Sequence, residues 1–493
     1  MSVDSTELRK STLQRKDREE LTAIATALGA KPSSRARKAE IVDLILDTVA
    51  DGDESEPDEP DQDEAPTEKG SGDRPDTGRE PAAAAEAVDK SRDDGGDQPE
   101  AGNRRRRRRG RGADREPASD NWDGDPIPVS GFLDLRDEGY GFLRTNGWVP
   151  SKDDAYVPVK MVRQFGLRKG DELAGASRPA NQNEKNPAIL TIESVNGADP
   201  AEGGDRVEFD ALVPALPTEQ LVQALTGDTE DPTGRIIDIV APLAKGQRTM
   251  VVGSPATDAS AILKSITRSI EANNPEVHII VLLVDERPED AIDFKRHLGK
   301  GEVQASTFDR PADEHVLVAE MTIERAKRMT EFGADVCVVM NGISRLARAY
   351  DAVAPSAGRS NRPVAIDPWA VYQTKKFLGA ARNVDGGGSL TVIATVDSGG
   401  SDADRVILEQ VADTAGAVLR LDDRAAHLQI RPPVDPVASG TRHLEAILDG
   451  ARLEQNRSLR RALAEAGDDA LGSLLTQLTA TSNNTELDPA RLG

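Results

Sequence analysis

The sequence has one cysteine, few aromatic residues and no long apolar segment. Because Cys337 is the only cysteine, no intramolecular disulfide can form, and its place in the apolar run 336–339 predicts a buried, unreactive thiol. No stretch reaches the roughly 20 apolar residues that a membrane helix needs. Residues 1–4 open a charged N-terminus without the apolar region of a signal peptide. We therefore expect a cytoplasmic protein with no membrane contact.

Positive charge is also scarce relative to negative charge. The chain has 62 lysine and arginine residues against 86 aspartate and glutamate residues, which gives a formal net charge of −24. This balance argues against nucleic-acid binding by the whole surface and confines any such binding to local patches. At 493 residues the chain is too long for one core, and two or three folded units are expected.

Residues 1–50 carry the first folded unit. Apolar residues recur at helical spacing between Leu21 and Ile45, which predicts a small helical domain. Three basic residues lie together at its turn: Arg35, Arg37 and Lys38. They form either a nucleic-acid contact or a solvated basic face, and the sequence does not choose between the two.

A linker follows over residues 51–125. It is rich in Asp, Glu, Pro and Gly and almost free of large apolar side chains, so it cannot offset the entropy of ordering and is predicted to be disordered. Its basic run 104–109 either contacts RNA in a salt-dependent way or pairs with the acidic half of the linker, residues 51–64.

Short alternating apolar runs broken by turn residues begin near Pro126 and predict a small β-barrel of the OB or cold-shock type over residues 126–200. Tyr140, Phe142 and Tyr156 gather here, in a chain with only 3% aromatic residues. Aromatic rings on one strand face can stack on single-stranded bases, and Arg144 is placed to meet a phosphate or a base edge. The alternative puts Phe142 in the barrel core, but the adjacent glycines favour an open face.

Residues 201–493 alternate apolar strands with helical stretches. The apolar runs are 249–252, 278–284, 335–340 and 390–394. Continuous apolar strands separated by helices predict a mostly parallel α/β sheet covered on both faces, which is the expected setting of a nucleotide-binding domain.

Several sequence motifs are similar to those of a known protein family. They are GYGFLR at 139–144, KGQR at 245–248, VDERPE at 284–289, ASTFD at 305–309, SRLARAY at 344–350, GAARN at 379–383 and SGTR at 439–442. In these motifs and in their order the chain resembles the Rho family of bacterial transcription terminators. The resemblance covers roughly residues 21–49 and 126–492.

The resemblance implies a RecA-like motor of the P-loop type, assembled as a hexamer, that uses ATP and Mg²⁺. Such a ring captures single-stranded RNA on its barrels, threads it through a central pore and dissociates RNA polymerase complexes. The implied RNA-binding residues are Tyr140, Phe142, Arg144, Asp154 and Tyr156. The implied catalytic residues are Glu286, which activates the attacking water, together with Arg287 and Arg442. By resemblance, Arg442 reaches the ATP site of the neighbouring subunit.

The phosphate loop departs from its pattern. A P-loop reads GxxxxGK[ST], because glycine amides cradle the phosphates, the lysine reaches the β/γ oxygens and the hydroxyl holds magnesium. Here Gly253 and Ser260 survive, but Asp258 and Ala259 replace the second glycine and the lysine. A carboxylate about 4 Å from a phosphate costs about 4 kcal/mol at an effective dielectric near 20.

Other parts of the implied machinery have changed as well. Asn341 stands where the family has the aspartate that supports magnesium, and Arg431 stands where it has an aromatic residue beneath adenine. In the second pore loop, residues 398–404 lack the family's lysine, which leaves acidic residues facing RNA. No metal site outside this degenerate pocket is predicted.

Three functions are compatible with this pattern. The leading hypothesis is a Rho-like RNA-binding factor that has lost its own ATP hydrolysis and regulates termination, in a homo-hexamer or in mixed rings with an authentic Rho. The second is a working termination helicase in which Arg248 or Lys264 neutralises the phosphates. The third is a passive RNA-binding scaffold whose linker charges make the functional contacts.

Overall fold

The computed structural model describes residues 124–181, 184–200, 206–225, 231–355 and 365–492, together with six isolated residues nearer the N-terminus. These six are Leu21, Ala25, Lys38, Ile41, Val42 and Ile45, all helical. The five apolar ones are buried, and they belong to a compact unit that spans Met1–Gly112. The arginine run and all but the last two residues of the predicted linker lie outside the described residues. Within the described part of the chain, no helix has the length and apolarity to cross a bilayer.

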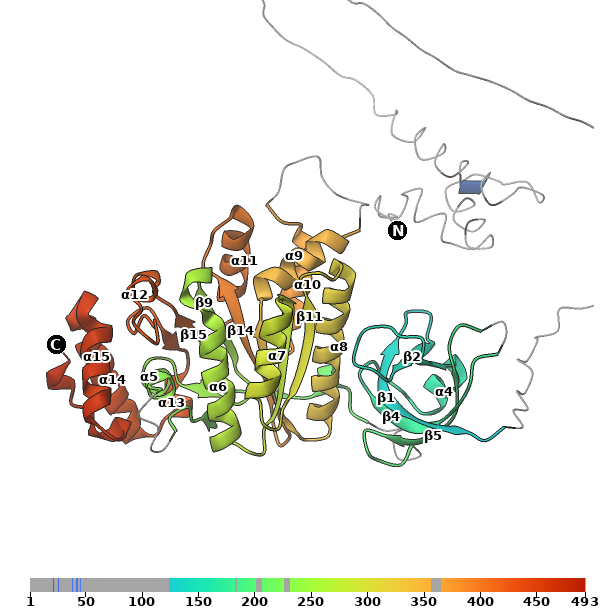
Figure 1. The fold of residues 1–493 in the computed structure, drawn as a ribbon, viewed down its shortest axis with the longest axis horizontal. Coiled ribbons are helices and arrows are strands. Elements are labelled where there is room, and N and C mark those ends of the chain that lie inside the picture. The colour runs from blue at the N-terminus through green and yellow to red at the C-terminus, as the bar shows by residue number, and fades with distance from the viewer. Residues whose placement is uncertain are drawn as a thin grey trace, which may run out of the picture. The chain divides into compact units, whose positions relative to one another are not determined.

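A closed five-stranded barrel opens the second unit (Figure 1). Its elements are β1 (Ile127–Leu135), β2 (Gly141–Arg144), β3 (Ala155–Val157), α4 (Val159–Gln164), β4 (Glu172–Arg178) and β5 (Ala188–Val195), with strand order β1-β2-β3-β5-β4. Alternate residues such as Leu133, Leu143 and Leu173 fill its core. A Cβ on Gly131 would lie 2.1 Å from the Arg144 carbonyl oxygen, so only glycine permits this close strand crossing. The predicted barrel is confirmed.

The α/β part is built on a nine-stranded sheet whose main path is β11-β10-β12-β14-β9-β15-β16. These strands are β9 (Arg248–Gly253), β10 (His278–Glu286), β11 (Glu302–Thr307), β12 (Asp335–Asn341), β14 (Ser389–Asp397), β15 (Ala417–Arg420) and β16 (Gly440–Thr441). All neighbours from β11 to β15 along this path pair in parallel, which confirms the predicted α/β architecture.

Helices cover both faces of this sheet (Figure 1). On one face lie α5 (Thr233–Val240), α6 (Ala259–Asn273), α7 (Pro288–His297), α14 (Gly450–Ala466) and α15 (Ala470–Ala480). On the other lie α8 (Ala312–Glu331), α9 (Ile343–Val353), α10 (Pro368–Gly379) and α11 (Asp402–Ala412). Successive strand residues enter opposite cores: Val251 packs on the first face, and Met250 and Val252 pack on the second. This alternation between two apolar layers explains why the strands are apolar throughout.

Cys337 lies inside β12 and is fully buried. Burial raises the pKa of its thiol to about 12, because the surrounding apolar side chains disfavour the thiolate. The prediction of a buried cysteine is confirmed.

Candidate nucleotide pocket and RNA-binding surface

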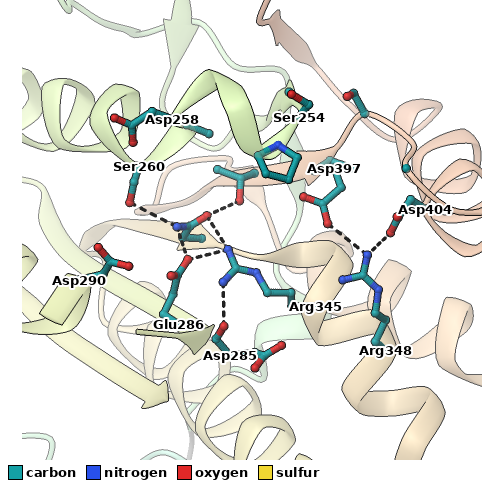
Figure 2. A pocket seen from close by; sticks show the side chains of 18 of the residues that line it. Ser254, Asp258, Ser260, Asp285, Glu286, Asp290, Arg345, Arg348, Asp397 and Asp404 are labelled. Atoms are coloured by element: carbon teal, nitrogen blue, oxygen red, sulfur yellow. Dashed lines mark hydrogen bonds and ion pairs between the residues drawn. The ribbon is translucent and has the colours of Figure 1, made fainter. Parts of the chain in front are cut away.

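A pocket of about 860 Å³ opens at the carboxyl ends of four neighbouring parallel strands, β9, β10, β12 and β14 (Figure 2). These strands end at Gly253, Glu286, Asn341 and Asp397, and all four residues line the pocket. Open α/β sheets bind ligands at this edge, because the loops that follow the strands converge there. The residues predicted for a degenerate ATP site are therefore brought together.

The loop after β9 forms hydrogen bonds between its own residues. It forms a short 3₁₀ turn, Pro255–Thr257, before α6 begins at Ala259. The Ser254 hydroxyl accepts a hydrogen bond from the Ala256 amide at 3.2 Å and donates one to Asp423 at 2.6 Å. Asp258 then takes the left-handed conformation, with φ 52° and ψ 55°, at the position where the family pattern has glycine. The Ala256 amide of this loop is therefore already hydrogen-bonded within the loop, and the Asp258 carboxylate lies where the loop meets α6.

The pocket has an excess of negative charge. Its described lining contains seven carboxylates against three guanidinium groups and no lysine, a formal excess of four negative charges. The acids are Asp258, Asp285, Glu286, Asp290, Asp397, Asp404 and Asp423, and the bases are Arg287, Arg345 and Arg348. A triphosphate entering this pocket would meet charge of its own sign.

Glu286 is held by two neighbouring side chains (Figure 2). It is only 7% exposed, and its carboxylate forms an ion pair with Arg345 at 2.6 Å and accepts a hydrogen bond from the Asn341 amide nitrogen. Arg345 also donates to the Asp285 carbonyl oxygen at 2.8 Å, which fixes the guanidinium in place. The predicted catalytic carboxylate is therefore neutralised within the chain.

Asn341 stands at the end of β12, at the position where the family pattern has an aspartate. Its amide nitrogen faces Glu286 and, at 3.4 Å, the Ser260 hydroxyl, while its oxygen accepts from the Thr395 hydroxyl at 2.7 Å. The group aimed at Glu286 and Ser260 is thus a donor, whereas magnesium binds oxygen acceptors. Thr395 was missed by sequence reasoning, although a polar residue within the buried strand 390–396 is a signal for it.

The acidic pore-loop residues do not all face outward. Asp404 is buried, caps α11 together with Ser401 and pairs with Arg348, which also contacts Asp397 at 3.3 Å (Figure 2). The prediction that this loop turns its carboxylates toward RNA is wrong for Asp404, because the helix N-terminus and Arg348 stabilise it inside.

Two further arginines were predicted from the resemblance. Arg287 lines the pocket and is exposed. Arg442 lies outside the pocket, at a second cavity of about 450 Å³, where it is exposed and donates to the Asp413 carbonyl oxygen at 3.1 Å. Its side chain is therefore placed to act outside the pocket of its own chain.

The proposed substitutes for the lost lysine do not lie in the pocket. Arg248 donates to the carbonyl oxygens of Thr414 and Ala381, both at 2.8 Å, and Lys264 pairs with Asp293. Neither lines the pocket, nor does the exposed Arg431. Neutralisation of phosphates by Arg248 or Lys264 has no support in this geometry.

On the barrel, three aromatic rings form one cluster. Tyr140, Phe142 and Tyr156 have centroids 5.7–6.0 Å apart; Tyr156 is exposed and the other two are partly exposed. Phe142 and Tyr156 are cross-strand partners on β2 and β3, which fixes their spacing. The alternative of Phe142 in the barrel core is not supported, since its ring belongs to this surface cluster.

Arg144 and Asp154 lie beneath the rings. Arg144 is 3% exposed and forms ion pairs with Asp154 at 2.5 Å and with Asp134. The sequence predicts that Arg144 meets a phosphate or a base edge; in this structure the two carboxylates already pair with its guanidinium, and the RNA contact stays a prediction. Asp134 was missed altogether, although a carboxylate between the apolar residues Leu133 and Leu135 of a strand is a signal of a buried ion pair. We infer that this triad positions Phe142, whose cross-strand partner is Asp134.

Comparison with known proteins first gives the class of each part. Residues 129–201 match the Rho termination factor RNA-binding domain, and residues 234–441 match the nucleotide-binding domain of the ATP synthase alpha/beta family. A solved ATPase of a bacterial type III secretion system aligns over 62% of this chain and 92% of its own, at 18% identity and a TM-score of 0.47.

The relatives then give the family. The transcription termination factor Rho of Streptomyces lividans is 45% identical over 410 residues, covering 80% of this chain and 57% of that protein. The Rho of Micrococcus luteus is 44% identical, with 73% and 53% covered, so this chain spans little more than half of either relative. The Rho of Cereibacter sphaeroides is 40% identical, with 74% of this chain and 87% of that protein covered. The chain belongs to the Rho family of transcription termination factors.

Proposed function

We propose that this chain is an RNA-binding Rho homologue that does not hydrolyse ATP itself and regulates termination from within mixed rings with an authentic Rho. The observation that carries the proposal is the capture of Glu286 by Asn341 and Arg345. A general base must reach a proton of the attacking water, and here an ion pair and an amide already occupy this carboxylate.

The residues of the pocket do not fit MgATP, the cofactor that the family implies. The missing lysine, the carboxylate of Asp258 and the four excess negative charges all disfavour a triphosphate. The amide of Asn341 offers Glu286 and Ser260 a donor where a cation would need an acceptor. These observations support a subunit that does not bind MgATP.

The mixed ring rests on Arg442. An exposed arginine away from its own pocket can serve the ATP site of an adjacent subunit, as arginine fingers do in trans. The subunit would then contribute to ATP hydrolysis in its neighbour while contributing none itself. Single-stranded RNA on the barrel and RNA polymerase at the transcription complex are the further partners, and the cytoplasm is the compartment.

The first test is equilibrium binding of a fluorescent ATP analogue with Mg²⁺, with and without RNA, alongside phosphate release. We expect neither binding nor turnover by the native chain. The triple variant Asp258→Gly, Ala259→Lys, Asn341→Asp is the positive control, because it restores the phosphate-loop and magnesium residues together. RNA-stimulated phosphate release by the native chain that Glu286→Gln abolishes would overturn the proposal.

The second test concerns the mixed ring. Tagged chain is co-expressed with an authentic Rho, the assembly is isolated, and its ATP hydrolysis is compared with that of the variant Arg442→Ala. We expect co-purification and a change in turnover for Arg442→Ala only. The matched control is Arg457→Ala, an exposed arginine on α14. No association with Rho would refute the mixed ring and leave the pocket conclusion standing.

A further inference from the structure

A second cavity, which we call the amino-edge cavity, lies at the edge of the sheet opposite to the nucleotide pocket. Its lining includes Arg248, the first residue of β9, and Gly416, which immediately precedes the parallel strand β15, so it lies at the amino ends of these strands. It has a volume of about 450 Å³ and shares no lining residue with the nucleotide pocket. This volume is in the range of pockets that hold small molecules.

The amino-edge cavity carries positive charge in a strongly acidic protein. Its lining has three guanidinium groups, those of Arg248, Arg382 and Arg442, against one carboxylate, that of Asp413. With His443 counted as neutral, three charges against one give a formal excess of two positive charges, in a chain with a net charge of −24. Asp413 is exposed and, in the part of the chain that the structure describes, forms no ion pair with any of the three arginines. The sign of the charge is therefore opposite to that of the nucleotide pocket.

Arg248 has no counter-charge among the described residues. It is partly buried, and its Nε and Nη1 atoms donate to the carbonyl oxygens of Thr414 and Ala381, which hold the guanidinium in place. Burial, and then the charge of Arg382, lower the pKa of Arg248 below the ordinary arginine value. A fixed and partly desolvated cation without a counter-charge is unfavourable by itself, and a bound anion would stabilise it.

The other two arginines keep much of their charge available. Arg382 pairs at 3.6 Å with Asp210, but this carboxylate is 84% exposed and does not line the cavity. Such an exposed pair is worth little. Arg442 is exposed, and the partner of its guanidinium is a neutral carbonyl oxygen, that of Asp413. Guanidinium groups from three separate segments of the chain thus line one cavity.

The rest of the wall is largely apolar. It comes from β6 (Pro214–Ala215), Leu216, Pro217, Ala381 and Ile447, the last residue of α13 (Leu444–Ile447). Leu216 is 57% exposed although its side chain is large and apolar, so the described residues leave this wall uncovered. Apolar walls with a few fixed polar groups are the usual composition of a pocket for a small organic molecule, because the polar groups set the orientation of the ligand.

We propose that the amino-edge cavity binds a small organic phosphate, whose phosphate group pairs with Arg248 and Arg382 while its apolar body lies against Leu216. A phosphate monoester carries a charge of about −1.5 to −2 near neutral pH, which matches the formal excess of two positive charges. Guanidinium groups also present paired N–H donors that suit phosphate oxygens. A carboxylic acid fits less well, because it brings a single charge. The inference goes beyond the proposed function and does not depend on it, since neither RNA nor a neighbouring subunit takes part.

The experiment is isothermal titration calorimetry of the full chain with phenyl phosphate, inorganic phosphate and benzoate. We expect one site per chain for phenyl phosphate. Inorganic phosphate lacks the apolar body and should bind about tenfold more weakly. Benzoate keeps the ring but has the smaller charge, so it should also bind more weakly. Nonspecific binding by the arginine run 104–109 would not distinguish the two phosphates.

Three variants locate the site. Arg248→Gln removes the charge and keeps a donor, and it should weaken phenyl phosphate binding at least about tenfold. Leu216→Asp places a negative charge at an exposed position of the wall and should abolish the binding without a folding defect. Asp413→Asn removes the one carboxylate of the cavity and should tighten the binding about threefold, the effect of one screened charge.

Arg457→Gln is the matched control, because Arg457 is an exposed arginine on α14 that does not line the cavity. Thermal unfolding checks that each variant is folded. The proposal is overturned if phenyl phosphate does not bind the native chain, if inorganic phosphate or benzoate binds as tightly, or if Arg457→Gln weakens binding as much as Arg248→Gln. Any of these results leaves the proposed function standing, because that function is measured with ATP, RNA and Rho.

Discussion

The barrel surface and the pocket both contain charged groups that are paired within the chain. The two regions differ in where these pairs lie relative to the groups that would contact a ligand. Beneath the barrel surface, Arg144 satisfies the buried carboxylates, and the aromatic rings above remain open. In the pocket, Arg345 and Asn341 satisfy Glu286 within the site itself, and the remaining carboxylates give an uncompensated negative charge. Internal pairing leaves the barrel rings accessible because it lies below them, whereas in the pocket it occupies the Glu286 carboxylate itself.

The largest effect should come from breaking the pairs beneath the barrel surface. Arg144→Met leaves Asp154 buried without a cation and Asp134 with only the partly exposed Arg136, which should lower the free energy of unfolding by about 3–5 kcal/mol. Thermal or urea unfolding of the full chain, followed on the barrel, measures this loss. Arg136→Met is the control, because Arg136 pairs with the same Asp134 at 3.1 Å from a 40% exposed position and should cost less than about 1 kcal/mol. If Arg144→Met kept its stability and lost RNA binding, Arg144 would be a direct contact after all.

The next largest effect should come from removing the aromatic rings that lie above the Arg144 ion pairs. Tyr140→Ala with Phe142→Ala should weaken RNA binding by about 1–3 kcal/mol for each base that loses its stacking partner. Binding of a labelled pyrimidine-rich RNA is measured at two salt concentrations, and the salt slope should stay constant because no cation is removed. Ile127→Ala, a 49% exposed apolar residue on the same barrel, should leave the affinity unchanged. Unchanged affinity in the double variant would assign the rings a purely structural role.

The pocket should respond to a single restored carboxylate. Asn341→Asp removes the donor to Glu286 and sets two carboxylates side by side, which should destabilise the chain by about 1–3 kcal/mol near neutral pH. The loss should shrink at low pH, where one of the two carboxyl groups is protonated. Unfolding at pH 5 and pH 8 measures the difference. Asn146→Asp makes the same change beside Asp153 on an exposed loop and should have no measurable effect. An equal loss at both pH values would argue against repulsion between carboxylates.

Much of the molecule follows from local sequence patterns, and the exceptions have physical reasons. Apolar periodicity and turn residues predict both folds, because each strand fills one or two apolar layers whatever the rest of the chain does. The ends of β9, β10 and β12 likewise converge wherever the strands are parallel, so the location of the pocket could be predicted. The site roles and domain bounds stay predictions.

The pairing of charged side chains could not be predicted from local sequence patterns. Arg144, Asp404 and Glu286 each have partners at least ten residues away in sequence, and only the closed fold decides whether a charge turns inward or outward.

The smallest expected effect concerns a partly exposed ion pair on the barrel, between Arg178 and Glu184. It contrasts with the buried pair between Arg345 and Glu286 in the pocket. The hydrogen bond from Arg178, followed by one from the Asn181 amide, lowers the pKa of Glu184 from its ordinary value of 4.5 to about 2. Because the folded-state pKa is depressed, the stabilisation is fully present above about pH 4.5 and is lost as the pH falls toward 2. Glu184 is 38% exposed, so solvent screening limits the effect of Glu184→Gln to less than about 1 kcal/mol. The unfolding curves of the native chain and the variant should differ at pH 6 and converge near pH 2, whereas a constant difference would mean that packing and not charge holds this pair.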